Sequence, residues 1–323
     1  MISNTSLLRR IDSYVAQHNL INSGDTIIIG LSGGPDSVFL TQYLVSIRDS
    51  LNLRLIAAHL NHGWRPEAEQ DVMWCQDFCK SLGIDFVTKH ADEIKLEKKL
   101  NGSKEELGRK LRRAFFSEIA QEYHAQLIAL GHHQDDSIET FFLNLIRGAT
   151  VNGLQGIKPK QGSIIRPLLS IKKSEILEYL KENNILYLKD YTNDQLDYLR
   201  NRIRHTIIPA FEQTDSRYEA KLLQTMAYFG NLDQFLHATT QEALNTISNG
   251  DAIDLNAFTS LTPFLQKRVL IIWLKKQAVP VIHSNAWLNE IIRYINEGKS
   301  SSHTIVENWK LIKNNNNILV KTN

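Results

Sequence analysis

The stretch IIIGLSGGPDSV (residues 27–38) places a hydrophobic run directly before a glycine-rich turn, and the residues after the turn have helical character. Pro35 suits a first helical position, because the N–H that proline lacks would be unpaired there in any case. Two glycines between a strand and a helix let backbone N–H groups converge on an anion, and the helix N-terminus adds positive charge. The stretch therefore predicts a phosphate-binding loop made of Ser32, Gly33, Gly34, Pro35, Asp36 and Ser37.

This loop differs from a Walker loop, because it lacks the lysine that reaches the terminal phosphates in that motif. Ser32 and Ser37 can add hydroxyl donors to the phosphate cradle. Asp36 is a poor phosphate ligand by itself, so we expect it to lie beside a magnesium ion or to order the backbone. An ordinary glycine turn without a ligand is the alternative at this position.

Short apolar runs alternate with helical patterns over the first half of the chain. The runs cover residues 26–31, 53–60, 84–90 and 127–132, and the helical patterns cover residues 36–48, 67–82, 103–122 and 135–146. This alternation predicts an α/β protein with a Rossmann-like parallel sheet and helices on both faces. Ligands of such sheets bind at the carboxyl ends of the strands, where polar residues follow each run here.

The pattern changes after Ala210, where amphipathic helical stretches replace the alternation of strands and helices. We therefore expect two domains, residues 1–210 and a smaller, mainly helical domain of residues 211–323. Near the end, two short strands joined through residues 314–317 predict a hairpin.

The composition is that of an ordinary globular chain, with 323 residues, 42% of them hydrophobic, and a formal net charge of +2. A nucleic-acid partner would have to bind local basic patches, since the net charge supplies no strong positive field. Cys75 and Cys79 are the only cysteines, which disfavours a disulfide scaffold and favours a reducing compartment. No apolar stretch reaches the length of a membrane span. We expect a cytoplasmic protein without a membrane partner.

The pattern SGGxDS resembles the PP-loop of the N-type ATP pyrophosphatases, which attack the α-phosphate of ATP, transfer AMP to an oxygen and release pyrophosphate. Other stretches are similar to the successive motifs of the tRNA(Ile)-lysidine synthetases. They are HLNHGWRPEAEQD (59–71), GSKEELGRKLRR (102–113), GHHQDDSIETFFLNLIRGATVNGLQGI (131–157), RPLL (166–169) and DYTNDQLDYLRNRIR (190–204). The resemblance is close over residues 25–210, and the remainder is similar in layout to that family's tRNA-recognition region. It also implies that this chain lacks the additional C-terminal domain of longer members.

The resemblance implies a two-step reaction that uses ATP and Mg²⁺. The ring carbonyl oxygen of the wobble cytidine of isoleucine tRNA is adenylated, and the side-chain amine of free L-lysine then displaces AMP to give lysidine. Residues 1–210 would form the catalytic domain, and residues 211–323 would recognise the tRNA. Basic residues that can follow the tRNA backbone are Lys267, Arg268, Lys275, Lys276, Lys299 and Lys310.

The second step requires a neutral amine, although a lysine side chain with an ordinary pKa is almost fully protonated at pH 7. His133 at a strand end can shuttle the proton, and neighbouring aspartates can bind magnesium or the lysine ammonium group. We predict catalytic roles for Asp36, His133, Asp136, Arg109 and Arg112, with Asp36 and Asp136 as metal ligands. The predicted substrate-binding residues are His59, Asn61, Asp135, Glu139, Arg200 and Arg204.

Several alternatives remain open from the residues alone. Paired acids at a helix N-terminus can simply complement its dipole, and isolated arginines are often solvated. His59 and His62 are also compatible with a zinc site. Rival classes are a thiolating relative, an amide-forming ATP pyrophosphatase and a non-enzymatic RNA-binding module. The identity of the general base, the selectivity for lysine and the choice between monomer and homodimer are also open.

Overall fold

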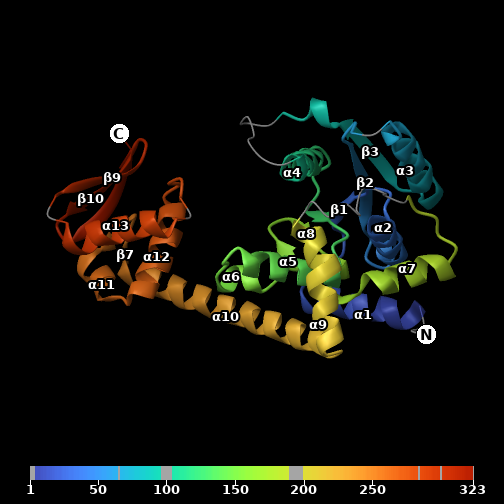
Figure 1. Cartoon of the computed structure of the whole chain (residues 1–323). Helices are drawn as coiled ribbons and strands as arrows, with labels where there is room; N and C mark the ends of the chain where they lie inside the picture. The colour runs from blue at the N-terminus through green and yellow to red at the C-terminus, as the bar shows by residue number, and fades with distance from the viewer. Residues whose placement is uncertain are drawn as a thin grey trace. The chain divides into compact units, whose positions relative to one another are not determined.

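The computed structural model describes residues 4–64, 66–95, 104–188, 199–282, 284–298 and 300–322 (Figure 1). Contacts divide the chain into two compact units, Met1–Ala227 and Tyr228–Asn323. The division falls inside the helix α10 (Tyr218–Ile247). Each unit is described below by itself.

A six-stranded sheet in the order β3-β2-β1-β4-β6-β5 forms the centre of the first unit. Neighbouring strands from β3 to β6 pair in parallel, and only the edge strand β5 runs antiparallel. The predicted α/β class with a parallel sheet is therefore confirmed. The strands are β1 (Thr26–Gly30), β2 (Arg54–Asn61), β3 (Asp85–His90), β4 (Leu127–Ala129), β5 (Lys160–Gln161) and β6 (Ile164–Ile165).

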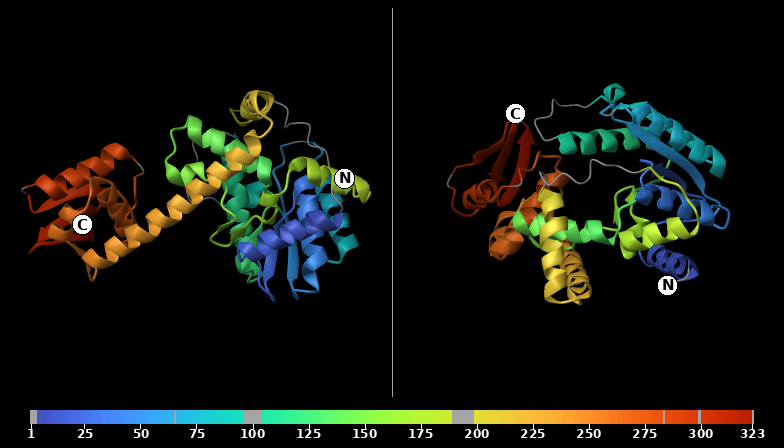
Figure 2. Two further views of the ribbon diagram at one scale, coloured as in Figure 1. Left: turned by 90° about the horizontal axis from the view of Figure 1, so that it is seen from below. Right: turned by 45° about the vertical axis from the view of Figure 1, so that its right-hand side comes forward.

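Helices cover both faces of this sheet (Figures 1 and 2). Ile27 and Ile29 of β1 point into a core shared with α1 (Asn4–Gln17), α2 (Pro35–Arg48), α3 (Ala68–Leu82) and α7 (Lys173–Glu182). Ile28 points to the opposite face, into a core shared with α4 (Lys104–Glu122). Successive side chains of a strand alternate between faces, which explains why this run is apolar throughout.

The carboxyl ends of β4 and β6 lead into the elements that complete the first unit. The remaining elements that follow β4 in the chain are α5 (Gln134–Ile146), α6 (Val151–Leu154), the 3₁₀ turn η2 (Pro167–Ser170), α8 (Leu199–Arg202), the π-helical turn η4 (Ile203–Ile207) and α9 (Ile208–Thr214). A further 3₁₀ turn, η1 (Ala91–Glu93), follows β3. Single π-helical turns are rare and frequently occur at functional sites.

The second unit combines helices with a five-stranded antiparallel sheet of order β7-β8-β11-β10-β9. The predicted hairpin is confirmed, since Asn314 pairs with Asn317, and Asn315 and Asn316 both have positive φ as a tight hairpin turn requires. The sequence prediction missed the other three strands of this sheet. The elements are α11 (Leu255–Ser260), α12 (Pro263–Lys276), α13 (Asn285–Glu297), β7 (Ser248–Asn249), β8 (Ala252–Asp254), β9 (Ser302–Val306), β10 (Trp309–Asn314) and β11 (Asn317–Thr322).

The second unit has a core of its own, centred on Trp273, Phe258 and Leu311, which are almost completely buried. Within the described ranges, none of the helices has the length and apolar character needed to cross a lipid bilayer.

Candidate active site

The glycine-rich loop joins β1 to α2, as the sequence predicts, and Ser37 closes it. The Ser37 hydroxyl donates to the carbonyl oxygen of Gly34 at 2.9 Å and accepts the N–H of Ser32 at 3.1 Å. Gly33 has φ of +80°, a left-handed conformation that favours glycine. The Ser37 hydroxyl thus ties the two ends of the loop together, and a glycine lies where the chain turns.

The carboxyl end of β4 lies directly against the first turn of α2. A Cβ atom on Gly131 would lie 2.9 Å from the carbonyl oxygen of Asp36 and 3.2 Å from the nitrogen of Ser37. Such distances are too short for any side chain, so glycine is required here. This backbone contact brings the following residue pair, His132 and His133, next to the loop.

His133 precedes α5 and lies among three aspartates. Its Nε2 atom is 3.4 Å from Asp136 Oδ2 and 3.8 Å from Asp36 Oδ1, while Nδ1 is 3.2 Å from Asp135 Oδ2. Burial alone would lower the pKa of His133, but the contact with Asp135 and the charges of Asp136 and Asp36 outweigh it and raise the pKa above its ordinary value. The imidazole is therefore biased toward its protonated form.

The aspartates beside His133 are biased toward their charged forms. Burial opposes ionisation of Asp135, but His133 and a hydrogen bond from the backbone N–H of Lys173 lower its pKa to about 2. Burial also opposes ionisation of Asp136, and the charges of His133 and Arg200 outweigh it and lower the pKa. The site therefore presents fixed negative charge next to the phosphate-binding loop.

Glu139 lies one turn further along α5 and is almost fully buried. Arg200 Nε donates to Glu139 Oε2 at 2.6 Å, and Arg200 Nη2 donates to Asp136 Oδ1 at 2.8 Å. Arg204, in the π-helical turn η4, donates from Nε to Glu139 Oε1 at 2.6 Å. The two arginines compensate the buried carboxylate, which would otherwise be costly to keep charged.

Lys173 belongs to this cluster, although the sequence prediction missed it. It is the first residue of α7, and its ammonium group donates a hydrogen bond to Asp36 Oδ1. Nothing in the stretch KKSE (172–175) distinguishes Lys173 from Lys172, so only the packing of α7 against α2 reveals it. The structure therefore brings Asp36, His133, Asp135, Asp136, Glu139, Arg200 and Arg204 together and adds Lys173.

His59 and Asn61, at the carboxyl end of β2, contact main-chain groups and a side chain of α3. His59 Nδ1 lies 3.0 Å from the carbonyl oxygen of Leu31, and burial lowers the pKa of its imidazole. Asn61 donates from Nδ2 to Glu69 Oε1 at 2.7 Å and accepts the N–H of Gly63 at 2.9 Å. Both side chains are buried, and their predicted role in substrate binding stays a prediction.

Arg109 and Arg112 lie on the exposed side of α4. Burial and then the charge of Arg112 lower the pKa of His62 to about 4, and burial and then the charge of Arg109 lower the pKa of Arg166. Gly108 of the same helix packs against Trp64 and His62, which follow β2, so this part of α4 lies near the end of β2. The catalytic role of Arg109 and Arg112 stays a prediction, and residues 96–103 and 189–198, which include parts of the motifs quoted above, lie outside the described residues.

The two cysteines are unsuited to nucleophilic chemistry. Both are completely buried on α3, and burial raises the pKa of each thiol to about 12. A thiolate, the reactive form, is therefore strongly disfavoured at either position. This argues against a catalytic role for these cysteines in a thiolation reaction.

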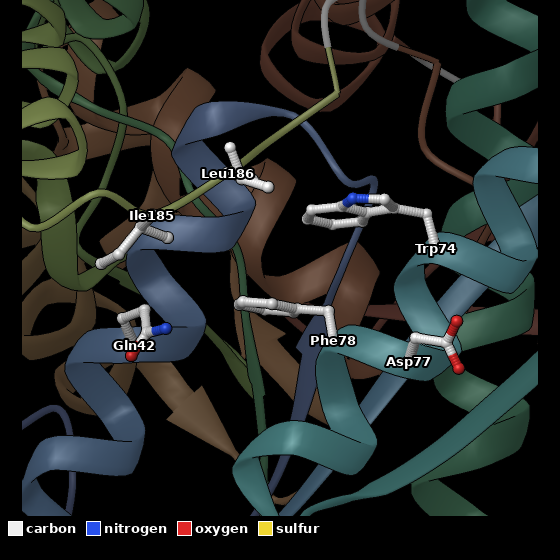
Figure 3. Close-up of a pocket in the computed structure, with 6 residues that line it drawn as sticks. All are labelled: Gln42, Trp74, Asp77, Phe78, Ile185 and Leu186. Carbon is white, nitrogen blue, oxygen red and sulfur yellow. The ribbon is translucent and has the colours of Figure 1, made fainter.

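A pocket of about 340 Å³ lies between α2, α3 and the stretch that follows α7 (Figure 3). The rings of Trp74 and Phe78 stack on one side of it, with centroids 5.2 Å apart, and face Ile185 and Leu186. Its lining residues are Gln42, Trp74, Asp77, Phe78, Ile185 and Leu186. The residues around His133 described above therefore do not line this pocket.

Comparison with known proteins shows the family to which the chain belongs. A family model described as a PP-loop domain matches residues 4–211. A tRNA(Ile)-lysidine synthase of Persephonella marina is 37% identical over 265 residues, which are 81% of this chain and 58% of that protein. A tRNA(Ile)-lysidine synthase of Chlorobaculum tepidum is 35% identical over 274 residues, which are 82% of each chain. The chain belongs to the tRNA(Ile)-lysidine synthase family of PP-loop proteins.

Membership of the tRNA(Ile)-lysidine synthase family confirms the resemblance drawn from the motifs. The chain spans less than two thirds of the length of the Persephonella relative, at 58%. The structure of the U34-tRNA thiolase NcsA from Methanococcus maripaludis matches with a TM-score of 0.59 and 21% identity, over 69% of this chain and 78% of that chain. This likeness shows a shared fold.

Proposed function

We propose that this protein ligates free L-lysine to the wobble cytidine of isoleucine tRNA, with ATP as the activating substrate. The ring carbonyl oxygen attacks the α-phosphate of ATP, pyrophosphate leaves, and the lysine amine then displaces AMP from the adenylated cytidine to give lysidine. The observation that supports the proposal most directly is the distance of 3.8 Å between His133 Nε2 and Asp36 Oδ1, which lies on the phosphate-binding loop. Membership of the lysidine synthase family supports the substrates.

The loop and the cluster have complementary roles in this scheme. Backbone N–H groups of Gly33 and Gly34 and the N-terminus of α2 bind the phosphates of ATP. The charged carboxylates of Asp135 and Asp136 attract the lysine ammonium group, and Glu139 positions Arg200 and Arg204 beside them. We assign the exchange of the amine proton to His133 as the carbon–nitrogen bond forms, because its imidazole lies among the carboxylates that attract the ammonium group.

We further propose that Asp36 and Asp136 are ligands of Mg²⁺. Their oxygens lie 3.8 Å and 3.4 Å from the same His133 nitrogen, so the two carboxylates lie close to each other beside the phosphate-binding loop. Among the described residues, no group of three or more His, Cys, Asp and Glu side chains is arranged to hold a metal. Two carboxylates fit Mg²⁺, which in nucleotide sites takes its remaining ligands from phosphates and water. When bound, the ion would neutralise charge on the phosphates.

The proposed role of residues 211–323 is to bind the tRNA. Lys275 and Lys276 are exposed at the end of α12, where they can contact a phosphate backbone. Arg268 is less available, since it donates to Thr240 Oγ1 at 3.1 Å and lies 3.8 Å from Asp233. Lys299 lies outside the described residues. We place the reaction in the cytoplasm, where tRNA and ATP are present, with no membrane partner.

Incorporation of radiolabelled lysine into unmodified isoleucine tRNA tests the proposal. The assay contains ATP, and parallel reactions supply a sulfur donor or ammonia in place of lysine. Label in the tRNA that depends on ATP supports lysidine formation. Transfer of sulfur or ammonia without transfer of lysine would contradict it and favour one of the rival classes.

A further inference from the structure

The phosphate-binding loop contains no lysine, yet an ammonium group lies against it. Lys173 donates a hydrogen bond to Asp36 although 137 residues separate them in the sequence. We infer that Lys173 is a phosphate-binding residue of this site, whose ammonium group leaves Asp36 when ATP binds and contacts the ATP phosphates. The inference rests on the proposed use of ATP and adds a residue to that function.

The backbone of Lys173 is fixed while its side chain can change partners. Its N–H donates to Asp135 Oδ2 at 2.9 Å, which holds the first turn of α7 against the cluster. The neighbouring N–H of Lys172 donates to Glu175 Oε2 at 2.8 Å, which closes the same turn. The Lys173 side chain is 33% exposed, so its flexible stem can swing without moving α7.

Charge balance provides the reason for the exchange. Asp36 is the second residue of α2 and directly follows the turn that binds phosphate, so its carboxylate repels an incoming nucleotide. Lys173 cancels that charge in the free protein. If a magnesium ion takes Asp36 as a ligand, the ammonium group loses its partner and can contact the phosphate chain on the loop. The lysine then supplies the charge that a Walker loop carries within its own sequence.

Lys172 provides a matched control, because it is the adjacent lysine and has a different partner. Its ammonium group lies 2.6 Å from Glu219 Oε2 on α10. Both lysines are partly exposed, and each pairs with one carboxylate of the described residues, so loss of either charge removes a comparable interaction. Only Lys173 is bonded to the loop.

The test measures binding by the full-length protein in calorimetric titrations with ATP, pyrophosphate and adenosine, each with EDTA and with Mg²⁺. We expect Lys173→Met and Lys173→Gln to weaken ATP and pyrophosphate binding at least about tenfold, a typical effect of one charge-assisted phosphate contact. Adenosine, which has no phosphate, should bind each variant as it binds the wild type. Lys173→Arg should keep most of the affinity, and Lys172→Met should bind within about twofold of the wild type.

Two outcomes would overturn the inference. Unchanged ATP binding by both neutral variants would show that Lys173 is only a partner of Asp36, and an equal loss for adenosine would show that it only supports the fold. Circular dichroism of each variant establishes that it is folded. A wild-type protein that binds no ATP would instead refute the proposed function, which separates the two failures.

Discussion

Arg200 donates a hydrogen bond of 2.6 Å to Glu139, although 61 residues separate the two in the sequence. The carboxylate is almost completely buried, whereas the guanidinium group is about one third exposed. Glu139 also accepts a bond from Arg204, so one buried acid holds two arginines in place. The elements α8 and η4 are thereby tied to α5.

Glu139→Gln should therefore destabilise the fold, because it removes the charge that compensates Arg200 and Arg204. Partial exposure of the arginines lets water screen them, so we expect the free energy of unfolding to fall by roughly 1–3 kcal/mol, less than for a fully buried pair. Urea denaturation measures this change. Glu182→Gln, at an exposed position of α7, should have little effect. Equal stability of the two variants would show that the arginines do not depend on Glu139.

Asp36→Ala should abolish ATP-dependent lysine transfer and leave the protein folded, since this partly exposed side chain belongs to the site and contributes nothing to the apolar core. Activity below about 1% of wild type, with an unchanged circular dichroism spectrum, is the expected result for a group that the chemistry requires. Asp49→Ala, at a highly exposed position after α2, is the control. Near-normal turnover of the Asp36 variant would remove this residue from the mechanism.

His133→Ala and Asp136→Asn should slow the chemical step far more than they weaken tRNA binding. We expect single-turnover lysine transfer to fall at least about 100-fold, as for groups that move or stabilise a proton in the transition state. Filter binding should give a tRNA dissociation constant within about threefold of wild type. Equal losses in the two measurements would make these residues tRNA contacts.

The raised pKa of His133 predicts a pH-dependent contribution to stability. The folded protein holds this proton more tightly than the unfolded chain, whose imidazole has the ordinary pKa of 6.5. The contribution is therefore complete below pH 6.5 and is lost as the pH rises through the raised pKa. Because His59 and His62 have lowered pKa values and act in the opposite sense, the measurement compares wild type with His133→Asn.

Urea denaturation of both proteins between pH 5.5 and pH 8.5 should show this effect, with the range set around the ordinary histidine pKa of about 6.5. The stability advantage of the wild type should shrink as the pH rises. A constant difference across the range would mean that His133 keeps the same protonation state in the folded and unfolded chains.

Charge reversal at Lys275 and Lys276 should weaken tRNA binding in a salt-dependent way. Each lost phosphate contact reduces the slope of log affinity against log salt by about 0.7–0.9, because fewer counterions are released. Lys80→Glu, exposed at the end of α3, controls for the change in net charge. An unchanged slope would mean that these two lysines make no phosphate contact.

The strand ends and the phosphate-binding loop could be predicted because their signals are local. The geometry of the loop at residues 32–37 follows from the order of strand, glycines and helix. The carboxyl ends of parallel strands necessarily lie at the same edge of the sheet. Glu139 could be grouped with Asp135 and Asp136 for a similar reason, since residues three and four apart share a helix face. These parts of the site require no knowledge of distant contacts.

The remaining parts depend on packing between distant segments. Lys173 differs from Lys172 only in the direction that α7 gives its side chain, and the sequence pattern does not contain that direction. The strands β7 and β8 were missed because two or three residues are too few to show an alternation. Arg109 and Arg112 have the spacing of paired phosphate ligands, yet that spacing does not specify which part of the sheet edge they approach.

The close approach of Gly131 to the first turn of α2 determines which parts of the site can adapt to a ligand. Main-chain atoms pack closely there, so β4 and the first turn of α2 cannot approach each other further, and the backbone segments that carry Asp36 and His133 lie against each other. The cations come instead from α7, α8 and η4, on partly exposed side chains. Glu139 and Asp136, whose side chains are 1% and 16% exposed, are thus the least adaptable groups of the site, and accommodation of successive substrates falls to the more exposed lysine and arginines around them.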